Sequence, residues 1–375
     1  MLKSLRIAAL TTLATLAPAG LAPAQDLDGL TTAELLPLAQ KEGKVTVFSL
    51  SSRIAKVEKA FEQAYPGIDM VGIDMSSVKQ IARVVAEQTA GVHAVDVLYI
   101  ADTPVVYEEL VTPKRVQAYI PPRVAGELAA EYKTPLLTQR LSTKVLMYNE
   151  AANPEGPPVK NLWQLTTPDW TGKVLMVDPL QRGELLDLLV EVALHPDEMA
   201  KAYEAQFGKP IVLADDVQGA GEQFIRDLFK NDLILVPNSD VLNKAVGDRA
   251  AQNPPVGFGT YSDRRDNEKE GWALQVANDV TPANGILFPA VLAVVDKTPN
   301  PAAARLLIDF MMGDDSSTGG AAFEPFNVPG DYPVRPSIKS HADSVPLDKL
   351  NAWRIDPVKT AAARKRIADL IITLQ

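Results

Sequence analysis

Short apolar runs alternate along the chain with longer segments in which apolar residues recur every three or four positions. The short runs predict strands, and the longer segments predict amphipathic helices. In the first half of the chain this pattern predicts strands at 44–50, 68–74 and 95–100, and helices at 54–65 and 77–90. Because strands and helices alternate, we predict a sheet of parallel strands covered by helices.

A second series of the same kind begins near residue 150. Between the two series, residues 143–161 predict a strand that leads into a segment rich in proline, glycine and asparagine, the composition of a connector. The pattern then predicts a strand at 173–177, a helix from about Gly183, helices near 196–207 and 217–230, and a strand at 232–236. These elements predict a second α/β lobe.

The apolar run at 286–295 predicts a strand that is buried on both faces, and Asn300 and Pro301 begin a further helix. This strand has no obvious partner in the second series, so we expect the chain to return to the first lobe. The predicted division is discontinuous: residues 25–145 with 283–350 form one lobe, 146–282 form the other, and 351–375 hold a final helix that could pack on either lobe.

One hydrophilic segment, SDRRDNEKEG at 262–271, lies between two apolar runs. Its composition predicts the exposed turn of a hairpin. A docking role is the alternative, since exposed loops often carry binding residues.

The first residues have the pattern of an export signal. Two basic residues precede an apolar run over 7–17, and a small-residue pattern typical of signal peptidase sites ends at Ala24. The run is too short and too interrupted to favour a membrane anchor. We therefore predict a signal peptide over residues 1–24, cleaved near Ala24, and export to the periplasm.

Composition narrows the possible functions. The chain has 375 residues, 46% hydrophobic and 22% charged, which is typical of a soluble protein with room for two domains. It contains no cysteine, which excludes disulfides, thiolate metal sites and a lipid-attachment cysteine. Without residues 1–24 the net charge is 35 − 47 = −12. Such a surface repels nucleic acid and anionic lipid, so neither is an expected partner.

The sequence contains no recognisable catalytic motif. Its three histidines, His93, His195 and His341, lie far apart, and the GxSxG, Walker A and GxGxxG patterns are missing. Carboxylates are numerous, which leaves a secreted hydrolase as an alternative, but number alone does not define a catalytic pair. We predict a protein that is not an enzyme and has neither a cofactor nor a metal site.

Polar residues follow several predicted strands at their carboxyl ends. In open α/β sheets ligands bind at this edge, where helix N-termini offer free N–H groups. The clusters come from both lobes: Ser51, Ser52 and Arg53; Ser77; Asp102; Arg182 and Gly183; Asn238, Ser239 and Asp240. Any one of these residues could instead be a helix N-cap. Their occurrence in both lobes favours a shared ligand cleft.

Several longer motifs occur in a characteristic order: AQKEGKVTVFS, FEQAYPGI and VDVL, then LWQLTTPDWTGKVLMVDP, GEQFI, TPNPAAARLLIDFMM and YPVRPSI. In this order the chain resembles bacterial periplasmic solute-binding proteins of the ferric-iron-binding type, over nearly its whole length after the signal. The resemblance implies an α/β fold of two lobes, each a helix-covered mixed sheet, with the ligand cleft between them. It also implies that the protein passes a small-molecule ligand to an inner-membrane ABC permease, and we predict a monomer. We predict that the lobes close about a hinge near 144–150 and 278–285.

The resemblance leaves the ligand open, because this group includes binders of ferric iron, thiamine, phosphonates and hexose phosphates. Iron-binding members hold the metal with adjacent tyrosines, and the corresponding stretch here, LVPNSDVLNKA, has no tyrosine. Its amide, hydroxyl and carboxylate groups suit an organic ligand better than a trivalent cation. A ferric-iron-binding protein, a secreted hydrolase and a sensor-associated binding module remain alternatives.

We predict that the ligand is a small organic anion with a phosphate, phosphonate or carboxylate group. This group would be held from both sides of the cleft by Ser51, Ser52, Arg53, Ser77 and Arg182. Hydroxyl or amino groups at the other end would be recognised by Asn238, Ser239, Asp240 and Asn284. The alternative is that the two arginines pair with acids such as Glu184 and Asp187 and face solvent.

Overall fold

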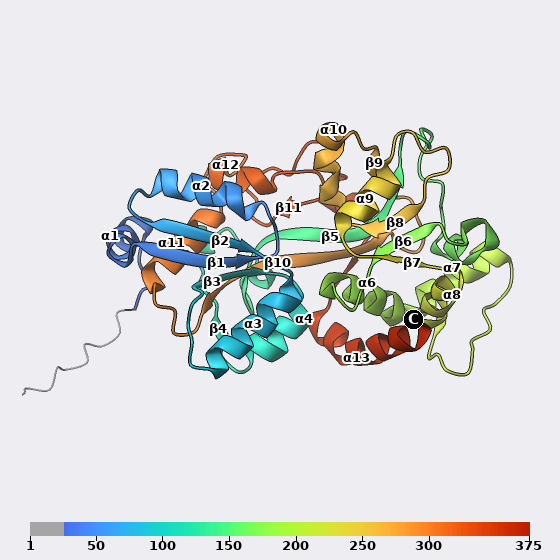
Figure 1. Ribbon diagram of the computed structural model, residues 1–375, viewed down its shortest axis with the longest axis horizontal. Helices are drawn as coiled ribbons and strands as arrows, with labels where there is room; N and C mark the ends of the chain where they lie inside the picture. The colour runs from blue at the N-terminus through green and yellow to red at the C-terminus, as the bar shows by residue number, and fades with distance from the viewer. Residues whose placement is uncertain (1–25) are drawn as a thin grey trace, which may run out of the picture.

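The structure is a computed structural model that describes residues 26–375 (Figure 1). The predicted signal peptide, residues 1–24, lies outside the described residues. Within residues 26–375, no helix is long and apolar enough to cross a membrane.

Hydrogen bonds join the main strands into one mixed sheet, in the order β2-β1-β3-β10-β5-β8-β6-β7. These strands are β1 (Lys44–Ser49), β2 (Asp69–Asp74), β3 (Val97–Ile100), β5 (Leu137–Asn149), β6 (Val174–Val177), β7 (Ile234–Val236), β8 (Val256–Gly259) and β10 (Gly285–Val295). The predicted parallel arrangement is confirmed for β1, β2 and β3. The late strand β10 runs antiparallel to β3 and β5, which makes the sheet mixed.

Four short strands extend the sheet. They are β4 (Val116–Gln117), β9 (Leu274–Val276), β11 (Tyr332–Pro333) and β12 (Trp353–Arg354). β4 and β12 pair with β10, whereas β9 and β11 pair with β5. The two longest strands therefore hold most of the connections between distant parts of the chain.

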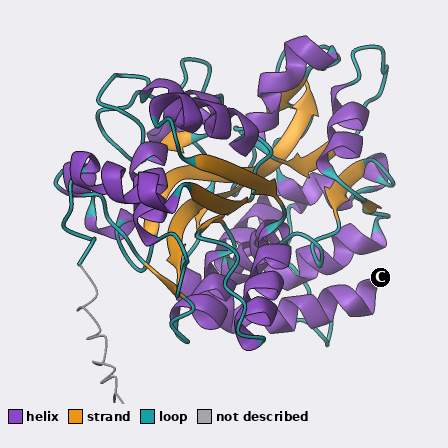
Figure 2. Ribbon diagram, turned by 60° about the vertical axis from the view of Figure 1, so that its left-hand side comes forward, coloured by secondary structure: helices purple, strands orange, loops and turns teal. Residues whose placement is uncertain are grey.

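Helices lie on both sides of the strands (Figure 2). We use "first lobe" for β1–β4 and the helices α1 (Thr32–Glu42), α2 (Ile54–Ala64), α3 (Ser77–Thr89), α4 (Thr103–Val106), α5 (Pro122–Ala125), α11 (Pro301–Met311) and α12 (Gly320–Phe323). We use "second lobe" for β6–β9 and the helices α6 (Gly183–Leu194), α7 (Pro196–Phe207), α8 (Ala220–Lys230), α9 (Ser239–Gly247) and α10 (Asn267–Glu270). The final helix is α13 (Pro357–Leu374).

Local sequence explains several of these boundaries. Thr31 and Glu34 form a capping box at the start of α1. α2 ends before Pro66 and Gly67, and Gly67 has φ +93, a conformation that favours glycine. The strands and helices predicted from the apolar pattern are confirmed, with ends that differ by a few residues at most.

The segment at 262–271 differs from its prediction. It is not a hairpin turn, because β8 and β9 do not pair with each other and each pairs with β5 instead. The chain between them forms a 3-10 helix, Tyr261–Asp266, followed by α10. A hydrophilic composition fits either an exposed turn or a helical connection that is partly buried. Composition alone therefore does not distinguish the two structures.

β5 passes through both lobes, so the lobes share one sheet. Its first part pairs with β10 and its last part with β8 and β9. The predicted two-lobed α/β arrangement with mixed, helix-covered sheet is confirmed, and the strands of the two lobes are continuous through β5. The lobe boundaries near 145 and 283 fall within β5 and just before β10, and they stay a prediction.

Buried apolar side chains gather in separate clusters. One contains Val47 and Phe61 with Leu307 from α11, and another contains Trp163, Leu189 and Phe224. Ile367 and Ile371 of α13 belong to the second of these clusters. The final helix therefore packs mainly on the second lobe, beside α6 (Figure 1).

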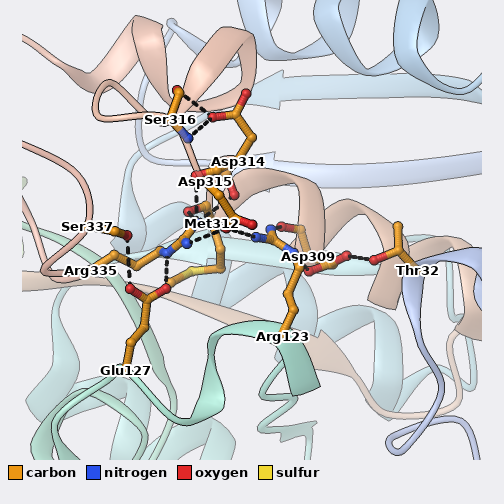
Figure 3. A network of polar contacts seen from close by, with 11 residues as sticks. Thr32, Arg123, Glu127, Asp309, Met312, Asp314, Asp315, Ser316, Arg335 and Ser337 are labelled. Atoms are coloured by element: carbon orange, nitrogen blue, oxygen red, sulfur yellow. Dashed lines mark hydrogen bonds and ion pairs between the residues drawn. The ribbon is translucent and has the colours of Figure 1, made fainter.

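A buried arginine fixes the end of α11 in the first lobe (Figure 3). The side chain of Arg335 is 3% exposed and pairs with Glu127. Its Nη1 donates to the carbonyl oxygens of Met312, Gly313 and Asp314, at 3.2, 2.8 and 2.9 Å. These carbonyls follow the last turn of α11 and have no helical partner, so Arg335 satisfies them. This contact explains the arginine in the motif YPVRPSI.

We predict that Arg335→Met destabilises the protein by about 3 kcal/mol or more, because Glu127 and three carbonyls lose their buried partner. Chemical denaturation at neutral pH measures this loss. The control is Lys365→Met, which removes an exposed pair with Asp369 and is expected to cost less than about 0.5 kcal/mol. Equal losses in the two variants would contradict the structural role of Arg335.

Candidate functional site

A cleft of about 380 Å³ lies between the two lobes, with its floor on β5 and β10. The first lobe contributes the loop after β1 and the end of β2. The second lobe contributes the starts of α6 and α9 and the segment after β8. The charged residues of its lining are Arg53, Asp74, Arg140, Lys144, Arg182, Glu184, Asp240, Asp263, Arg265 and Asp266.

Seven of the eleven residues predicted to bind ligand line this cleft: Ser51, Ser52, Arg53, Arg182, Asn238, Ser239 and Asp240. They come from both lobes, as expected from the carboxyl ends of the strands. Asn238 also caps α9, because its side chain accepts a hydrogen bond from the backbone N–H of Val241 at 3.0 Å. Its amide nitrogen is the part that remains available to a ligand.

Ser77 and Asn284 lie outside the cleft lining. Ser77 is buried, donates to Glu184 at 3.3 Å and accepts from the backbone N–H of Ala101 at 3.2 Å. Asn284 is fully buried, and its backbone bonds to Asn351 and Leu146. Both side chains are enclosed by protein, so they do not reach the ligand space.

Asp102 and Gly183 also lie outside the lining, and they contact each other. Asp102 is buried and pairs with Arg364 of α13. A Cβ added to Gly183 would lie 2.1 Å from the Asp102 carboxylate. The glycine is thus needed for close packing between lobes, which the pattern of strand ends does not reveal.

The floor of the cleft contains residues that the sequence analysis missed. Arg140, Ser142 and Lys144 line the cleft from β5. Because alternate side chains of a strand point to the same face, these three residues share one side of β5. The available signal was the run of polar residues at 138–144 inside a strand that is almost wholly buried. The segment after β8 was missed because its charges resembled those of a solvated turn; it contributes Thr260, Ser262, Asp263, Arg265 and Asp266.

A buried carboxylate, Asp331, forms ion pairs with two arginines of the cleft. It accepts from Arg53 at 2.7 Å and pairs with Arg140 at 3.0 Å. Arg140 is 1% exposed, and burial lowers the pKa of its guanidinium to about 10. Burial by itself would raise the pKa of Asp331, but Arg140 and Arg53 hold it below its ordinary value. Asp331 is therefore the partner of Arg53, and not Glu184 or Asp187, the acids named in the alternative interpretation of the sequence.

Lys144 and Arg182 differ from the other cations of the cleft, because no carboxylate pairs with them among the described residues. Lys144 donates to the hydroxyl of Thr260 at 2.7 Å. Burial lowers the pKa of Lys144, and the negative charges of Glu184 and Asp263 partly offset this effect. Arg182 precedes the first turn of α6, and its charge partly offsets the rise that burial causes in the pKa of Asp74.

The chemistry of this cleft is that of a polar binding site. Two unpaired cations lie among hydroxyl groups from Ser51, Ser142 and Thr260, and apolar contact comes from Phe288 and Trp272. Of the residues that the structure describes, no tyrosine or histidine lines it. Within residues 26–375, no group of three or more histidine, aspartate or glutamate side chains is arranged to hold a metal ion. The donors present match an anionic group joined to polar groups.

The continuous sheet, the two lobes and the polar cleft between them define the α/β fold of periplasmic binding proteins. The sequence profile of bacterial extracellular solute-binding proteins matches residues 49–323, and the chain belongs to this family. It is a family of binding proteins, not enzymes, which removes the secreted-hydrolase alternative. No curated protein sequence matches the chain significantly.

Solved structures agree with this fold. Iron-bound HitA from Pseudomonas aeruginosa has a TM-score of 0.68 and 17% identity, covering 88% of this chain and 99% of its own. AfuA from Actinobacillus pleuropneumoniae, with fructose-6-phosphate bound, has a TM-score of 0.64 and 16% identity over 88% and 97% of the two chains. An ABC transporter substrate-binding protein from Agrobacterium tumefaciens has a TM-score of 0.63 and 14% identity, over 88% and 94%. At these identities the likeness establishes the fold and not the ligand.

We predict that Asp331→Asn destabilises the protein by about 3 kcal/mol at pH 7, because Arg140 stays buried without its counter-charge. Since the native pKa of Asp331 lies below its unfolded value, its contribution is present above about pH 4 and is lost as the pH falls through the native pKa. The difference in free energy of unfolding between wild type and variant should therefore shrink from pH 7 to pH 3.

Urea denaturation across this pH range tests the prediction. Asp240→Asn, which changes an exposed carboxylate of the same cleft, is the control and is expected to shift stability by less than about 0.5 kcal/mol. A difference for Asp331→Asn that stays constant with pH would contradict a charged, paired Asp331.

Proposed function

We propose that this protein captures a small organic anion in the periplasm and passes it to an ABC importer. The observation that carries the proposal is the pair of cations without carboxylate partners, Lys144 and Arg182, which line the cleft from its floor and from the second lobe. An anionic group between them would receive charge-assisted hydrogen bonds, which are the strongest available in such a site. A phosphate, phosphonate or carboxylate ligand is compatible with both donors.

Neighbouring hydroxyl groups support a ligand with further polar groups. Ser51 and Ser52 follow β1, and Asn238 with Ser239 begins α9 on the other side of the cleft. These groups can exchange hydrogen bonds with ligand hydroxyl or amino groups. Fructose-6-phosphate, which AfuA holds in its structure, combines a phosphate with hydroxyl groups and illustrates this chemistry.

Ferric iron is the second candidate, because iron-bound HitA shares the fold. Hard phenolate or carboxylate oxygens arranged around one point would suit a trivalent cation. The lining offers no tyrosine, and Asp263 and Asp266 are already paired with Arg265 at 2.9 and 3.0 Å. The donor set therefore favours an organic anion.

Capture would use closure of the two lobes over the ligand. The proposed hinge comprises residues 144–150 at the end of β5 and 278–285 before β10, the places where the chain passes between lobes. Import fits the Agrobacterium tumefaciens ABC transporter protein that shares this fold. The predicted signal peptide would direct export of the chain, which would act as a monomer. The alternative to import is that the protein passes its ligand to a membrane sensor.

We predict that native mass spectrometry of the purified protein detects a co-purified anionic metabolite, and that calorimetry with this compound gives specific binding. Lys144→Met and Arg182→Gln should each weaken binding by about 10- to 100-fold, because each removes a charge-assisted hydrogen bond of about 1.5–3 kcal/mol. The control is Lys269→Met, an exposed lysine of α10 outside the cleft, which should leave affinity unchanged.

A thermal-shift panel distinguishes the two candidates. Fructose-6-phosphate, a phosphonate, citrate and ferric chloride would be compared at equal concentration. The organic-anion proposal would be overturned if ferric chloride alone raised the melting temperature strongly, and if Lys144→Met and Arg182→Gln showed the same rise with ferric chloride as the wild type.

A further inference from the structure

The final helix α13 is bound firmly to the second lobe. Thr360 donates to Glu191 of α6 at 2.6 Å, and Arg366 binds both carboxylate oxygens of Glu222 of α8 at 2.7 and 2.6 Å. Ile367 and Ile371 are buried in the same apolar cluster as the second-lobe helices. α13 should therefore move as part of the second lobe.

α13 also packs against α4 of the first lobe, and one of its side chains makes a polar contact there. Arg364 Nη1 donates to Asp102 Oδ1 at 2.5 Å and also to Asp187 of α6. Asp102 follows β3 of the first lobe, and both carboxylate side chains are 1% exposed. Among residues 26–375 this is the only polar side-chain contact between α13 and the first lobe. Figure 1 shows α4, α6 and α13 meeting at this place.

Asp102 is closely packed. A Cβ on Gly183 would lie 2.1 Å from the Asp102 carboxylate, so the start of α6 touches this side chain directly. Asp102 also has φ +66, which is costly for a residue with a side chain. An apolar cavity of about 510 Å³ nearby is lined by Thr103 and Val106 of α4 and by Pro357 and Val358 at the start of α13. The ionic contact therefore lies where α4, α6 and α13 pack together between the lobes.

The charges at this contact do not balance. Asp102, Asp187 and Glu184 face one guanidinium, Arg364, while Glu191 lies further along α6. Lys144 and Arg182 are the other cations near Glu184. Burial raises the pKa of Asp102 to about 6, and it raises the pKa of Asp187 well above its ordinary value; Arg364 opposes both shifts.

We infer that Asp102, Arg364 and Asp187 form a proton-linked contact between the lobes, which makes opening of the ligand cleft depend on pH. Separation of the lobes would move Asp102 away from Gly183 and Arg364 and into water. Asp187 and Arg364 would stay together, because both belong to the second-lobe assembly. Gly183 and Glu184 directly follow Arg182 of the cleft, so the contact and the ligand site share the first turn of α6.

The direction of the effect follows from linkage. In water the pKa of Asp102 would return towards its ordinary value of 3.8, whereas in the contact it is about 6. The arrangement with touching lobes therefore binds a proton more tightly and is favoured as the pH falls. Between pH 8 and pH 5 the equilibrium between touching and separated lobes should shift about tenfold towards touching.

Fluorescence energy transfer on the ligand-free protein tests this inference. The chain has no cysteine, so Lys59→Cys on α2 and Lys244→Cys on α9, both exposed, place one dye on each lobe. We expect the population with touching lobes to rise from pH 8 to pH 5. Asp102→Asn, which removes the titrating carboxylate, should reduce the pH response to less than twofold.

Gly183→Ala supplies an independent test and remains informative if Asp102→Asn does not fold. Its Cβ would occupy the position of the Asp102 carboxylate, so the lobes should be separated at every pH. The control is Arg366→Gln, on the same helix but paired only within the second lobe, which should keep the wild-type pH response.

A dye distance that does not change between pH 8 and pH 5, or a response in Asp102→Asn equal to that of the wild type, would overturn the inference. So would unchanged lobe contact in Gly183→Ala. The inference uses the proposed function only in linking lobe contact to ligand capture. Because the measurement needs no ligand, failure of this contact and failure of the organic-anion proposal are distinguishable.

Discussion

β5 is the element on which both lobes depend, because this one strand of 13 residues hydrogen-bonds to strands of each. Pulling either lobe away would expose backbone N–H and C=O groups that have no other partner. In the proposed hinge motion, the lobes would turn about β5 and β10 and remain attached to them. The same pairing keeps the polar face of β5, with Arg140, Ser142 and Lys144, at the floor of the cleft.

Buried charge determines which of the cleft's cations are structural. Asp331 holds Arg53 and Arg140, and the aromatic rings of Tyr99 and Phe326 lie beside Arg140. Among residues 26–375 no carboxylate pairs with Lys144 or Arg182, and we propose that these two cations meet an incoming anion. A negative net charge does not prevent anion binding, because local donors in an enclosed cleft act at much shorter range than the charge of the whole surface.

The final helix connects this binding site to lobe motion. Its apolar residues and two polar contacts attach it to the second lobe, whereas Arg364 reaches the carboxylate of Asp102 in the first. Several carboxylates are buried around one guanidinium at the lobe contact, and this burial raises their affinity for a proton. A helix at the end of the chain can thus influence the cleft through the first turn of α6.

The sequence by itself determined the strands and helices of both α/β series, the order of the family motifs and seven of the cleft residues. These features depend on local apolar periodicity and on the rule that polar residues at strand ends meet at one edge. The tertiary structure alone decided that β5 joins the lobes into one sheet, that Asp331 pairs with Arg53 across 278 residues, and that Asp102 faces α13. These outcomes depend on pairings between distant segments, and no local pattern specifies which distant carboxylate or strand will be the partner.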